Sequence, residues 1–565
     1  MKRTKRFAIA AAFGVALSTG LSSCSGGGGS TPTPTPAPTA TAQPLGQASA
    51  ARLLTQATFG PTYDMVTAAS TQTYDQWFTA QAAAAPSLTS PLVAANANGG
   101  WTQYWWRNAV LGPDQLRQRM AFALSEIFVV QGLPDSATGV PANLAAYYDI
   151  LVNDSLGNYR KLLEDVTLSP EMGLFLNMFR NDRPDPARGR HADENYAREV
   201  MQLFSVGLVR LNADGSVQTD SSGNPVPTYS QAEVEGLARV FTGWASQPTD
   251  HTGDQAFQFD QDYVHQMVAY ENHHDPDAKT ILGGTQVPAG GTAAADLKIA
   301  LDAIFNHPNV GPFLSRQLIQ RLVTSNPSPA YVQRVATIFN NNGQGVRGDL
   351  LAVARAILTD PEAVASGGNN YGKLREPIVR MAHLWRAFNA TDQNGALNEF
   401  LIVNQSSEIF SQSPLMAPSV FNFFVPDYVR AGPLATAGLV APEFQITNEN
   451  SSILTANRLE RQAYQFVDST GTIYFSPSGF SEVSSLNSSS VLLRTNQWEP
   501  LADDPAALID RLSLVLMQGQ MPAAMRTTLI NYVAAIPTST AGYRGYRAIE
   551  AASLIINSPQ YSVQR

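Results

Sequence analysis

Apolar residues recur at intervals of three and four positions through most of the chain between Gly46 and Arg565. The spacing is clearest before Phe204, in "ASAARLLTQATFG", "WTQYWWRNAVLGPDQLRQRMAFALSEIFVVQ" and "NLAAYYDILVNDSLGNYRKLLEDV". It returns in "AADLKIALDAIFNH" and again after Asp504. Such spacing gathers apolar side chains on one face of an α-helix. We therefore predict a mainly α fold, a large multi-helix single body over residues 46–565.

Two segments interrupt the helical pattern. Between Leu211 and Thr228 the sequence "LNADGSVQTDSSGNPVPT" carries Asp-Gly and Gly-Asn turn signals beside short extended runs. This predicts a small inserted β-hairpin. Its acidic loop lacks the spaced oxygen ligands of an EF-hand, so we favour a plain turn over a calcium site. A second region, near residues 417–500, is rich in Ser, Asn, Phe and Pro, and we expect it to be irregular.

The N-terminus has the pattern of a secretory signal. "MKRTKR" is basic, and the apolar run Phe7 to Leu21 that follows is too short for a comfortable membrane-spanning helix. The run ends in "LSSC", which resembles the lipobox of bacterial lipoproteins. Cys24 is the one cysteine of the chain, so no disulfide can form within it. We interpret residues 1–23 as a lipoprotein signal peptide and Cys24 as the lipid attachment site.

A tether follows the predicted lipid anchor. Residues 24–45 are rich in Gly and Ser and then in Thr and Pro, a composition that stays extended and builds no core. Acyl chains on Cys24 would hold the protein on a membrane without spanning it. Ser25 stands where an inner-membrane retention signal would have Asp, and by resemblance to Gram-negative lipoproteins we expect an exported outer-membrane lipoprotein.

Charge and motifs exclude several classes of function. The net charge is -9, and no Lys or Arg run beyond the N-terminus offers a stripe for phosphates, so nucleic acid is not an expected partner. The sequence has no G-x-S-x-G elbow, no P-loop and no G-x-G-x-x-G after a strand. No motif identifies a cofactor, and metal dependence stays open.

The segment "HADENYAREVMQLFSVGL" contains the first group of candidate catalytic residues. On a helix capped by Asp193, the side chains of Glu194, Arg198 and Glu199 fall on one polar stripe. The opposite face carries apolar side chains, which are Tyr196, Val200, Leu203 and Phe204. The stripe is either a solvated, salt-bridged helix face or a buried polar network. We favour the buried network slightly, because the segment lies between long apolar helices.

The second group of candidates lies in "HHDPDAKTILGG", residues 273–284. His273, His274 and Asp275 are residue types that bind metals, but adjacent residues rarely face one ion and no HExxH pair is present. The plainer interpretation is a turn in which His274 and Asp275 hydrogen-bond the loop. Two further histidines, His307 and His383, lie in apolar helical settings and are expected to be structural.

Several motifs in order resemble the bacterial domain-of-unknown-function family 1800. The resemblance covers nearly all of residues 46–565 and implies an exported, mostly helical protein without an established reaction. Genes of this family often neighbour those of exported proteins that resemble alkaline phosphatases, which implies a partner of that kind. The motifs are "QLRQRMAFALSEIFVV", "YRKLLEDVTLSPEMGLFLN", "DENYAREVMQLFSVGL", "LARVFTGW", "HHDPDAKTILGG", "RQLIQRLVTSNPSPAYVQRV" and "APEFQI".

Two hypotheses of function follow. In the first, the protein is a lipid-anchored envelope protein, a helical scaffold or binding protein that acts with another exported protein. In the second, it is an exported hydrolase-like enzyme in which Glu194, Glu199, His274 and Asp275 converge in one cleft, with Arg198 orienting a carboxylate or neutralising an oxyanion. The second hypothesis requires these side chains to lie within about 10 Å of one another, a scale set by catalytic carboxylate pairs.

Overall fold

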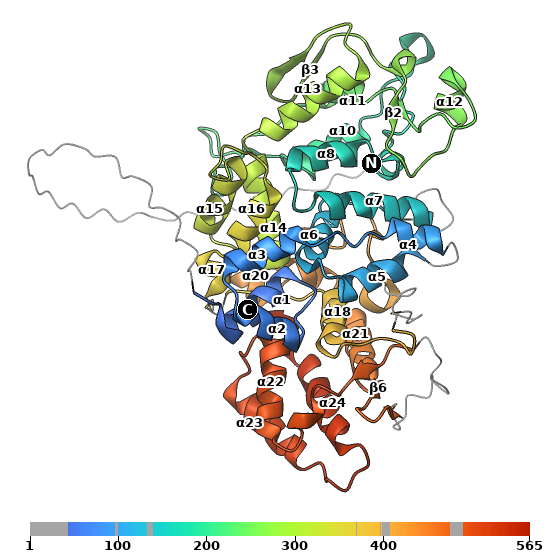
Figure 1. Cartoon of the computed structure of the whole chain (residues 1–565). Helices are drawn as coiled ribbons and strands as arrows, with labels where there is room; N and C mark the ends of the chain where they lie inside the picture. The colour runs from blue at the N-terminus through green and yellow to red at the C-terminus, as the bar shows by residue number, and fades with distance from the viewer. Residues whose placement is uncertain are drawn as a thin grey trace, which may run out of the picture. The chain divides into compact units, whose positions relative to one another are not determined.

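Helices make up most of the body, as the apolar spacing predicts (Figure 1). The structure is a computed structural model that describes residues 43–96, 100–132, 139–365, 367–368, 370–395, 397, 407–474 and 490–565. The predicted signal peptide, Cys24 and nearly all of the predicted tether lie outside these residues. Within them, no helix is long and apolar enough to cross a membrane.

The helices before the middle of the chain follow one another with short connections. Their ends are set by ordinary capping chemistry; Thr73, for example, forms a capping box with Gln76 at the start of the third helix. They are α1 (Gly46–Ala57), α2 (Tyr63–Ser70), α3 (Tyr74–Ala83), α4 (Ser90–Ala95), α5 (Trp101–Leu111), α6 (Gln115–Ser125), α7 (Pro141–Asp154), α8 (Tyr159–Thr167), α9 (Pro170–Phe175), α10 (Asn195–Gln202), α11 (Gln231–Val240) and α12 (Gly253–Phe259).

The later helices include the longest apolar ones. They are α13 (Ala293–Asn306), α14 (Val310–Leu322), α15 (Pro329–Asn340), α16 (Leu350–Leu358), α17 (Pro361–Val364), α18 (Pro377–Ala387), α20 (Pro433–Thr436), α21 (Glu449–Ala463), α22 (Pro505–Met517), α23 (Ala523–Ala534), α24 (Tyr543–Ile556) and α25 (Pro559–Ser562). Short 3-10 helices are η2 (Pro186–Arg188), η3 (Glu271–His273), η4 (Leu282–Gly284), η5 (Pro442–Gln445) and η6 (Glu499–Leu501).

Strands are short and act as clips between helices. Antiparallel pairs join β1 (Trp244–Ala245) to β2 (Val268–Ala269), β3 (Lys279–Ile281) to β4 (Thr285–Val287), and β5 (Lys373–Leu374) to β9 (Val563–Gln564). A three-stranded sheet has the order β7 (Ile473–Tyr474), β6 (Phe466–Val467), β8 (Leu493–Arg494). The β5–β9 pair brings the last residues of the chain beside the start of α18.

The predicted inserted hairpin is not a regular hairpin. Within the fully described segment 208–228, antiparallel contacts are isolated bridges, Leu211 with Val217 and Thr219 with Pro225, and a further bridge joins Val209 to Pro227. The Asp side chains of the two turns bind their own backbone, as Asp214 does at Ser216. Each turn therefore satisfies its polar groups locally, which is the plain-turn interpretation.

Aromatic side chains hold the centre of the body together. Trp105 and Trp106 of α5 are buried, with ring centroids 5.2 Å apart, and Trp106 lies 5.2 Å from Trp385 of α18. Such edge-to-face pairs add about 0.5–1.5 kcal/mol each to the burial of the rings. Helices far apart in the sequence, α5 and α18, are thereby fixed against one another.

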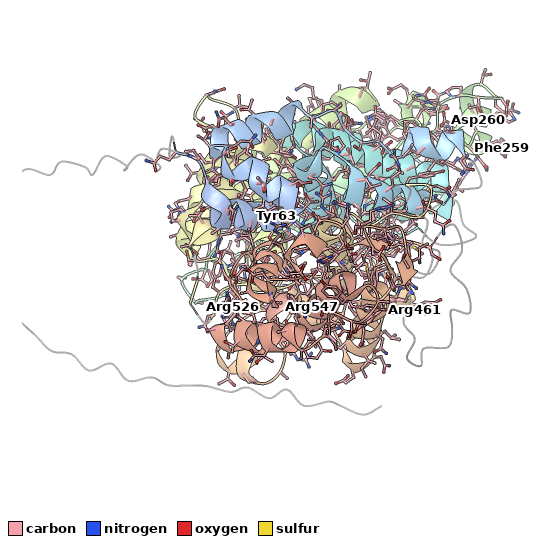
Figure 2. All side chains as sticks on the ribbon, turned by 60° about the horizontal axis from the view of Figure 1, so that its bottom comes forward. Tyr63, Phe259, Asp260, Arg461, Arg526 and Arg547 are labelled. Atoms are coloured by element: carbon pink, nitrogen blue, oxygen red, sulfur yellow. The ribbon has the colours of Figure 1, made fainter. Side chains whose placement is uncertain are left out.

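The C-terminal helices α22, α23 and α24 pack against one another (Figure 1). Arg547 of α24 donates hydrogen bonds to the carbonyl oxygens of Ala502 (2.8 Å) and Ile536 (2.7 Å), which lie just before α22 and just after α23. Its labelled position in Figure 2 is within this group of helices. A buried guanidinium can satisfy several carbonyl groups at once, so one side chain ties three segments together.

Candidate functional site

The predicted stripe on α10 divides into an exposed part and a buried part. Arg198 Nη2 lies 2.8 Å from Glu194 Oε2, and both side chains are about one third exposed, at 38% and 34%. Gln231 of α11 bonds both, donating to Glu194 at 2.9 Å and accepting from Arg198 at 3.1 Å. This part is a partly solvated ion pair. The apolar face is confirmed, because Tyr196, Val200 and Phe204 are buried.

Glu199, one turn further along α10, is buried. Its Oε2 has no hydrogen-bond partner among the described residues. Burial raises the pKa of Glu199, although the charge of Arg198 opposes this shift. Burial, with a smaller contribution from the charge of Glu199, raises the pKa of Tyr229 to about 12. Glu199 is thus the buried member of the stripe.

The His274 loop forms a separate buried network. His274 places Nδ1 3.0 Å from the Thr242 carbonyl oxygen and Nε2 3.2 Å from Asp296 Oδ2. Lys279 Nζ donates to the same Asp296 oxygen at 2.6 Å. The neighbouring Asp275 binds Arg239 Nε at 2.5 Å, and its pKa is lowered because these hydrogen bonds outweigh burial. The loop therefore fastens β3 and α13 to the end of α11.

His273 points away from His274. Its Nδ1 lies 3.2 Å from Asp182 Oδ1, and its ring stacks on Phe257 with centroids 3.7 Å apart. The two adjacent histidines therefore face different partners. Among the described residues, no group of three or more His, Cys, Asp or Glu side chains is arranged to hold a metal ion.

The two predicted groups, one on α10 and one in the His274 loop, contact opposite ends of α11. Glu194 and Arg198 contact Gln231 at its first residue, whereas Asp275 contacts Arg239 near its last turn. Eight residues of helix separate these contacts by about 12 Å along the axis. No described hydrogen bond or ion pair joins the groups, and none of the five candidates lines a described cavity. The described contacts therefore do not bring the two groups together, and the shared cleft and the catalytic roles of these residues stay predictions.

A cavity of about 440 Å³ lies elsewhere, between the ends of α6 and α10, the side of α14 and residues 420–427. Its walls are mostly apolar. Three large apolar side chains on it are exposed to solvent, Leu208 (58%), Phe421 (49%) and Val217 (45%). Exposed apolar side chains gathered at a concave site are typical of ligand-binding pockets.

Charged residues line one part of this cavity. They are the exposed Arg316 and Asp427, and two residues nearly inaccessible to solvent, Glu126, which follows α6, and Arg321 of α14. Arg321 Nη2 donates to the Glu126 carbonyl oxygen at 2.8 Å, and its Nε lies 3.5 Å from Glu126 Oε2. An apolar pocket with a few fixed polar groups combines affinity with orientation of the ligand.

Behind Glu126 lies a second buried carboxyl group, that of Glu376 at the start of α18. The two carboxyl groups hydrogen-bond to one another. Gln412 Nε2 donates to both, at 3.3 Å to Glu126 and 2.7 Å to Glu376. Two buried carboxyl groups in contact cannot both ionise cheaply, so the pair holds a proton.

The surroundings place this proton on Glu126. Burial and the charge of Glu376 hold the pKa of Glu126 well above its ordinary value. Burial would also raise the pKa of Glu376, but the charges of Lys373 and Arg119 outweigh it and hold that pKa below its ordinary value. A protonated carboxyl group at the cavity wall is thus paired with an ionised one behind it, and environments that differ in this way are typical of acid–base pairs.

Three cations and a third carboxylate complete the cluster. Lys373 Nζ lies 3.0 Å from Glu443 and 3.6 Å from Glu376. Arg119 lies 3.9 Å from Glu376 and donates to the Arg321 carbonyl oxygen at 2.6 Å. With Glu126 protonated, the cations Arg119, Lys373 and Arg321 outnumber the ionised carboxylates.

Unsatisfied polar atoms and strained backbone gather at this site. Glu126 Oε2, Gln320 Oε1 and Asn422 Nδ2 are buried without a hydrogen-bond partner among the described residues, and all three residues line the cavity. Asn422 also has a left-handed φ of 66°, as does Leu415 at 54° in the same connection. Orphaned polar atoms and left-handed non-Gly residues are costly, and they concentrate where a site needs them.

The acid cluster was not predicted from the sequence, although its members lie in segments that stand out there. Glu126 in "AFALSEIFVV" and Glu443 in "APEFQI" are isolated charges in largely apolar runs, whereas Glu376 in "REPIVRMAHLW" follows Arg375 directly. A lone charge within an otherwise buried pattern is the signal that could have found Glu126 and Glu443.

Comparison with known proteins identifies the family of the chain. No curated protein and no solved structure matches the chain. A family described as "Protein of unknown function (DUF1800)" matches residues 52–563, which is nearly all of the body. The matched range contains α10, the His274 loop and every residue of the acid cluster. The chain therefore belongs to the DUF1800 family.

Proposed function

We propose that the body is a binding protein whose 440 Å³ cavity receives a largely apolar ligand. The observation that carries the proposal is the polar end of a mostly apolar cavity, where Glu126 and Arg321 meet. The one proton of Glu126 is taken by its hydrogen bond with Glu376, whereas Arg321 Nε has no described hydrogen-bond partner and can only donate. The ligand's polar end is then an acceptor such as the oxygen of a carbonyl, ester or amide group.

Saturable binding of the neutral dye Nile red, which is apolar and carries a carbonyl oxygen, tests this proposal in the full chain. Glu126→Gln keeps the shape and the hydrogen bonds of the protonated carboxyl group and should bind the dye nearly as well as the parent. Glu126→Leu leaves Arg321 without its carboxyl neighbour and should weaken binding by about fivefold, the value of one net hydrogen bond. Leu208→Asp should also weaken binding, because it places a charge on the apolar wall. Glu194→Gln, which alters an ion pair away from the cavity, is the matched control. Equal binding by all four variants would sink the proposal.

We further propose that the protein is exported and held on a membrane by lipid on Cys24, with another exported protein, alkaline-phosphatase-like by family resemblance, as its partner. The support is the signal-like N-terminus and the lipobox-like "LSSC". Radiolabelled palmitate should be incorporated into the parent chain and not into Cys24→Ser. The Cys24→Ser chain should be released from membranes but should still retain the partner. Equal labelling of both chains would reject the anchor, and loss of the partner would place the interaction at the N-terminus rather than on the body.

A second candidate function is general-acid catalysis in the same cavity. It is favoured by the opposite pKa directions of the two touching carboxyl groups. Water would add to an ester carbonyl carbon, Glu126 would give its proton to the leaving oxygen as the C–O bond breaks, and the proton released by the water would return to Glu126. Glu376, which does not line the cavity, would position that proton. Hydrolysis of an alkyl ester, whose leaving alkoxide needs a proton, should then fall as pH rises through the raised pKa of Glu126 and should be lost in Glu126→Gln. A Glu126→Gln variant that binds ligand and has the parent's turnover would leave binding as the whole function.

A further inference from the structure

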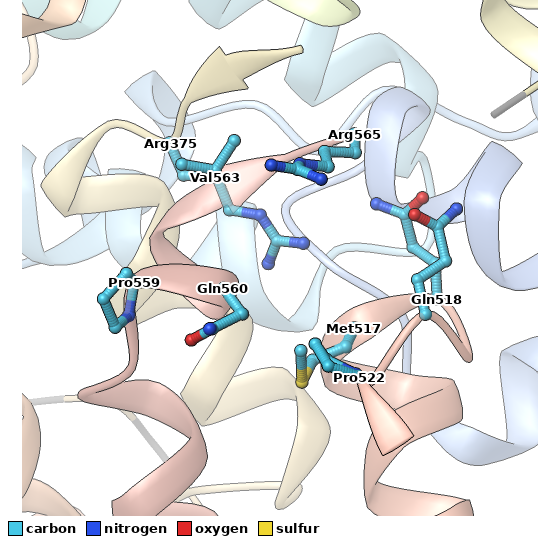
Figure 3. A pocket seen from close by; sticks show the side chains of 9 residues that line it. Arg375, Met517, Gln518, Pro522, Pro559, Gln560, Val563 and Arg565 are labelled. Atoms are coloured by element: carbon cyan, nitrogen blue, oxygen red, sulfur yellow. The ribbon is translucent and has the colours of Figure 1, made fainter. Parts of the chain in front are cut away.

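A second cavity, of about 300 Å³, lies beside the end of α22 and the C-terminal segment (Figure 3). Met517, Pro522 and Pro559 give it apolar walls, while Arg375 and Arg565 bring guanidinium groups to it. No Asp or Glu side chain of the described part of the chain lines it. A cavity with two arginines and no acid has a positive potential that the protein itself does not neutralise.

Arg375 is the buried cation of this cavity. Its Nη1 lies 3.1 Å from His383 Nδ1 and donates weakly to the Leu516 carbonyl oxygen at 3.4 Å. Its Nε has no hydrogen-bond partner among the described residues, and no described carboxylate lies within ion-pair distance. The guanidinium instead lies over the Tyr561 ring, 4.9 Å from its centroid. Burial lowers the pKa of Arg375, and the nearby Tyr561 opposes this shift only partly.

No acidic side chain around Arg375 supplies the missing negative charge, and the Arg565 backbone oxygen accepts from Arg52 at 3.2 Å. Arg380 is a second, half-buried cation over the same ring, and the Arg565 side chain is an exposed one at the cavity. Burial and the charge of Arg375 hold the pKa of His383 well below its ordinary value, so this ring is neutral. The last carbonyl groups of α22 offset at most about half a charge, the size of a helix dipole at its end. A buried cation without a counter-ion is strongly unfavourable.

We propose that this cavity binds a small organic carboxylate, whose charged end meets Arg375 and whose carbon chain lies on Met517 and Pro522. The planar guanidinium matches the geometry of a carboxylate, and its free Nε supplies a donor. Gln518 also lines the cavity, with its Oε1 buried without a described partner and its backbone left-handed at φ 57°. Because an amide oxygen only accepts, a carboxylate requires the Gln518 amide group to turn so that Nε2 donates to it. This site is separate from the Glu126 cavity and does not depend on the function proposed for it.

Calorimetric titration of the full chain with pentanoate and with pentanamide tests the proposal. The two probes have nearly the same shape and differ in charge. Pentanoate should bind saturably and raise the melting temperature, whereas pentanamide should do neither. Absence of saturable pentanoate binding up to about 10 mM, where even a millimolar site would be largely filled, would overturn the proposal. Equal binding of the two probes would also overturn it, because charge would then play no part.

Variants separate this binding site from a purely structural arginine that caps α22. Arg375→Lys keeps the positive charge but loses the planar N–H donors of the guanidinium group. It should weaken pentanoate binding about tenfold, as expected for a charge-assisted hydrogen bond. Arg565→Gln should weaken it about threefold, because Arg565 is exposed. Arg107→Gln removes an exposed arginine that lines neither cavity and should leave pentanoate binding unchanged.

If Arg375→Lys does not fold, pentanoate binding by Arg565→Gln and Gln518→Ala tests the site instead. Parent-like pentanoate binding in every folded cavity variant would reject the site.

Discussion

The carboxyl groups of Glu126 and Glu376 are hydrogen-bonded to one another inside the body, one after the end of α6 and the other at the start of α18. Their surroundings differ. Glu376 faces Lys373 and Arg119, whereas Glu126 is held protonated by burial and by the charge of Glu376. Replacing one or the other should therefore have unequal effects.

Glu126→Gln should leave the free energy of unfolding at pH 7 nearly unchanged, because an amide mimics the protonated carboxyl group. Glu376→Gln should lower it by about 3–5 kcal/mol, because Lys373 and Arg119 lose an ionised partner in the interior. Urea unfolding of the two variants and the parent measures the difference. A similar loss in both variants would contradict the assignment of the proton to Glu126.

Glu171 of α9 should make stability depend on pH. The side chain is fully buried, neither oxygen has a described partner, and burial raises its pKa to about 9. Because the folded pKa lies above the unfolded one, its stabilising effect is complete below the ordinary pKa of Glu and is lost as pH rises towards 9. The slope between these limits is about 1.4 kcal/mol per pH unit.

Glu171→Gln should remove this slope and so become increasingly stabilising, relative to the parent, as pH rises from 5 to 9. Urea unfolding across this range gives the measurement. Glu194→Gln, on a partly exposed ion pair, is the control and should shift stability by less than about 1 kcal/mol. Parallel pH profiles for the parent and Glu171→Gln would show that Glu171 is already ionised in the folded state.

The two groups first suspected of catalysis should differ in their effect on stability. Asp296→Asn leaves the buried Lys279 cation without its carboxylate and should cost about 3–5 kcal/mol. Arg198→Gln breaks an ion pair that is partly solvated and should cost less than about 1 kcal/mol. Thermal unfolding compares them. A cost for Arg198→Gln as large as that for Asp296→Asn would mean that the α10 pair is more buried than its exposure indicates.

Gly236 allows α11 to touch β3. A Cβ atom at this position would lie 2.0 Å from the Thr280 carbonyl oxygen, so Gly236→Ala must push the strand away. We expect a loss of about 2 kcal/mol or more in the free energy of unfolding, as for overpacked cores. Gly100→Ala, where no atom lies within 4 Å of the added methyl group, should change stability little. Equal stability of the two variants would show that the helix and strand move apart freely.

Apolar spacing predicts the helices well because burying one helix face is the main local determinant of this fold. The core positions Tyr196 and Val200 were found in this way. Apolar spacing could not predict that Glu194 is partly exposed and Glu199 is buried, because these exposures depend on which segments cover α10. It also could not pair Glu126 with Glu376, since the contact joins two distant helices and leaves no local pattern.

The small hairpin expected at Leu211 to Thr228 is present only as antiparallel bridges, for a related reason. The Asp-Gly and Gly-Asn signals do form turns, but the extended residues between them make only isolated bridges. Asn309 of the segment before α14 takes some of their hydrogen bonds, receiving one from the Leu211 backbone. Partners from elsewhere in the chain thus replace part of the ladder that the local signals favour.

The pairing of β5 with β9 determines when, during synthesis, the acid cluster can form. Lys373, the cation shared by Glu376 and Glu443, belongs to the strand that pairs with Gln564, and Gln564 Nε2 also donates to the Leu322 carbonyl oxygen at 2.7 Å. Residues 563–564 follow every other member of this network in the sequence, so they are synthesised after all of them. The acid cluster therefore cannot reach its final form until residue 564 has left the ribosome, and the nascent polypeptide stays incompletely closed although its three acids are already made.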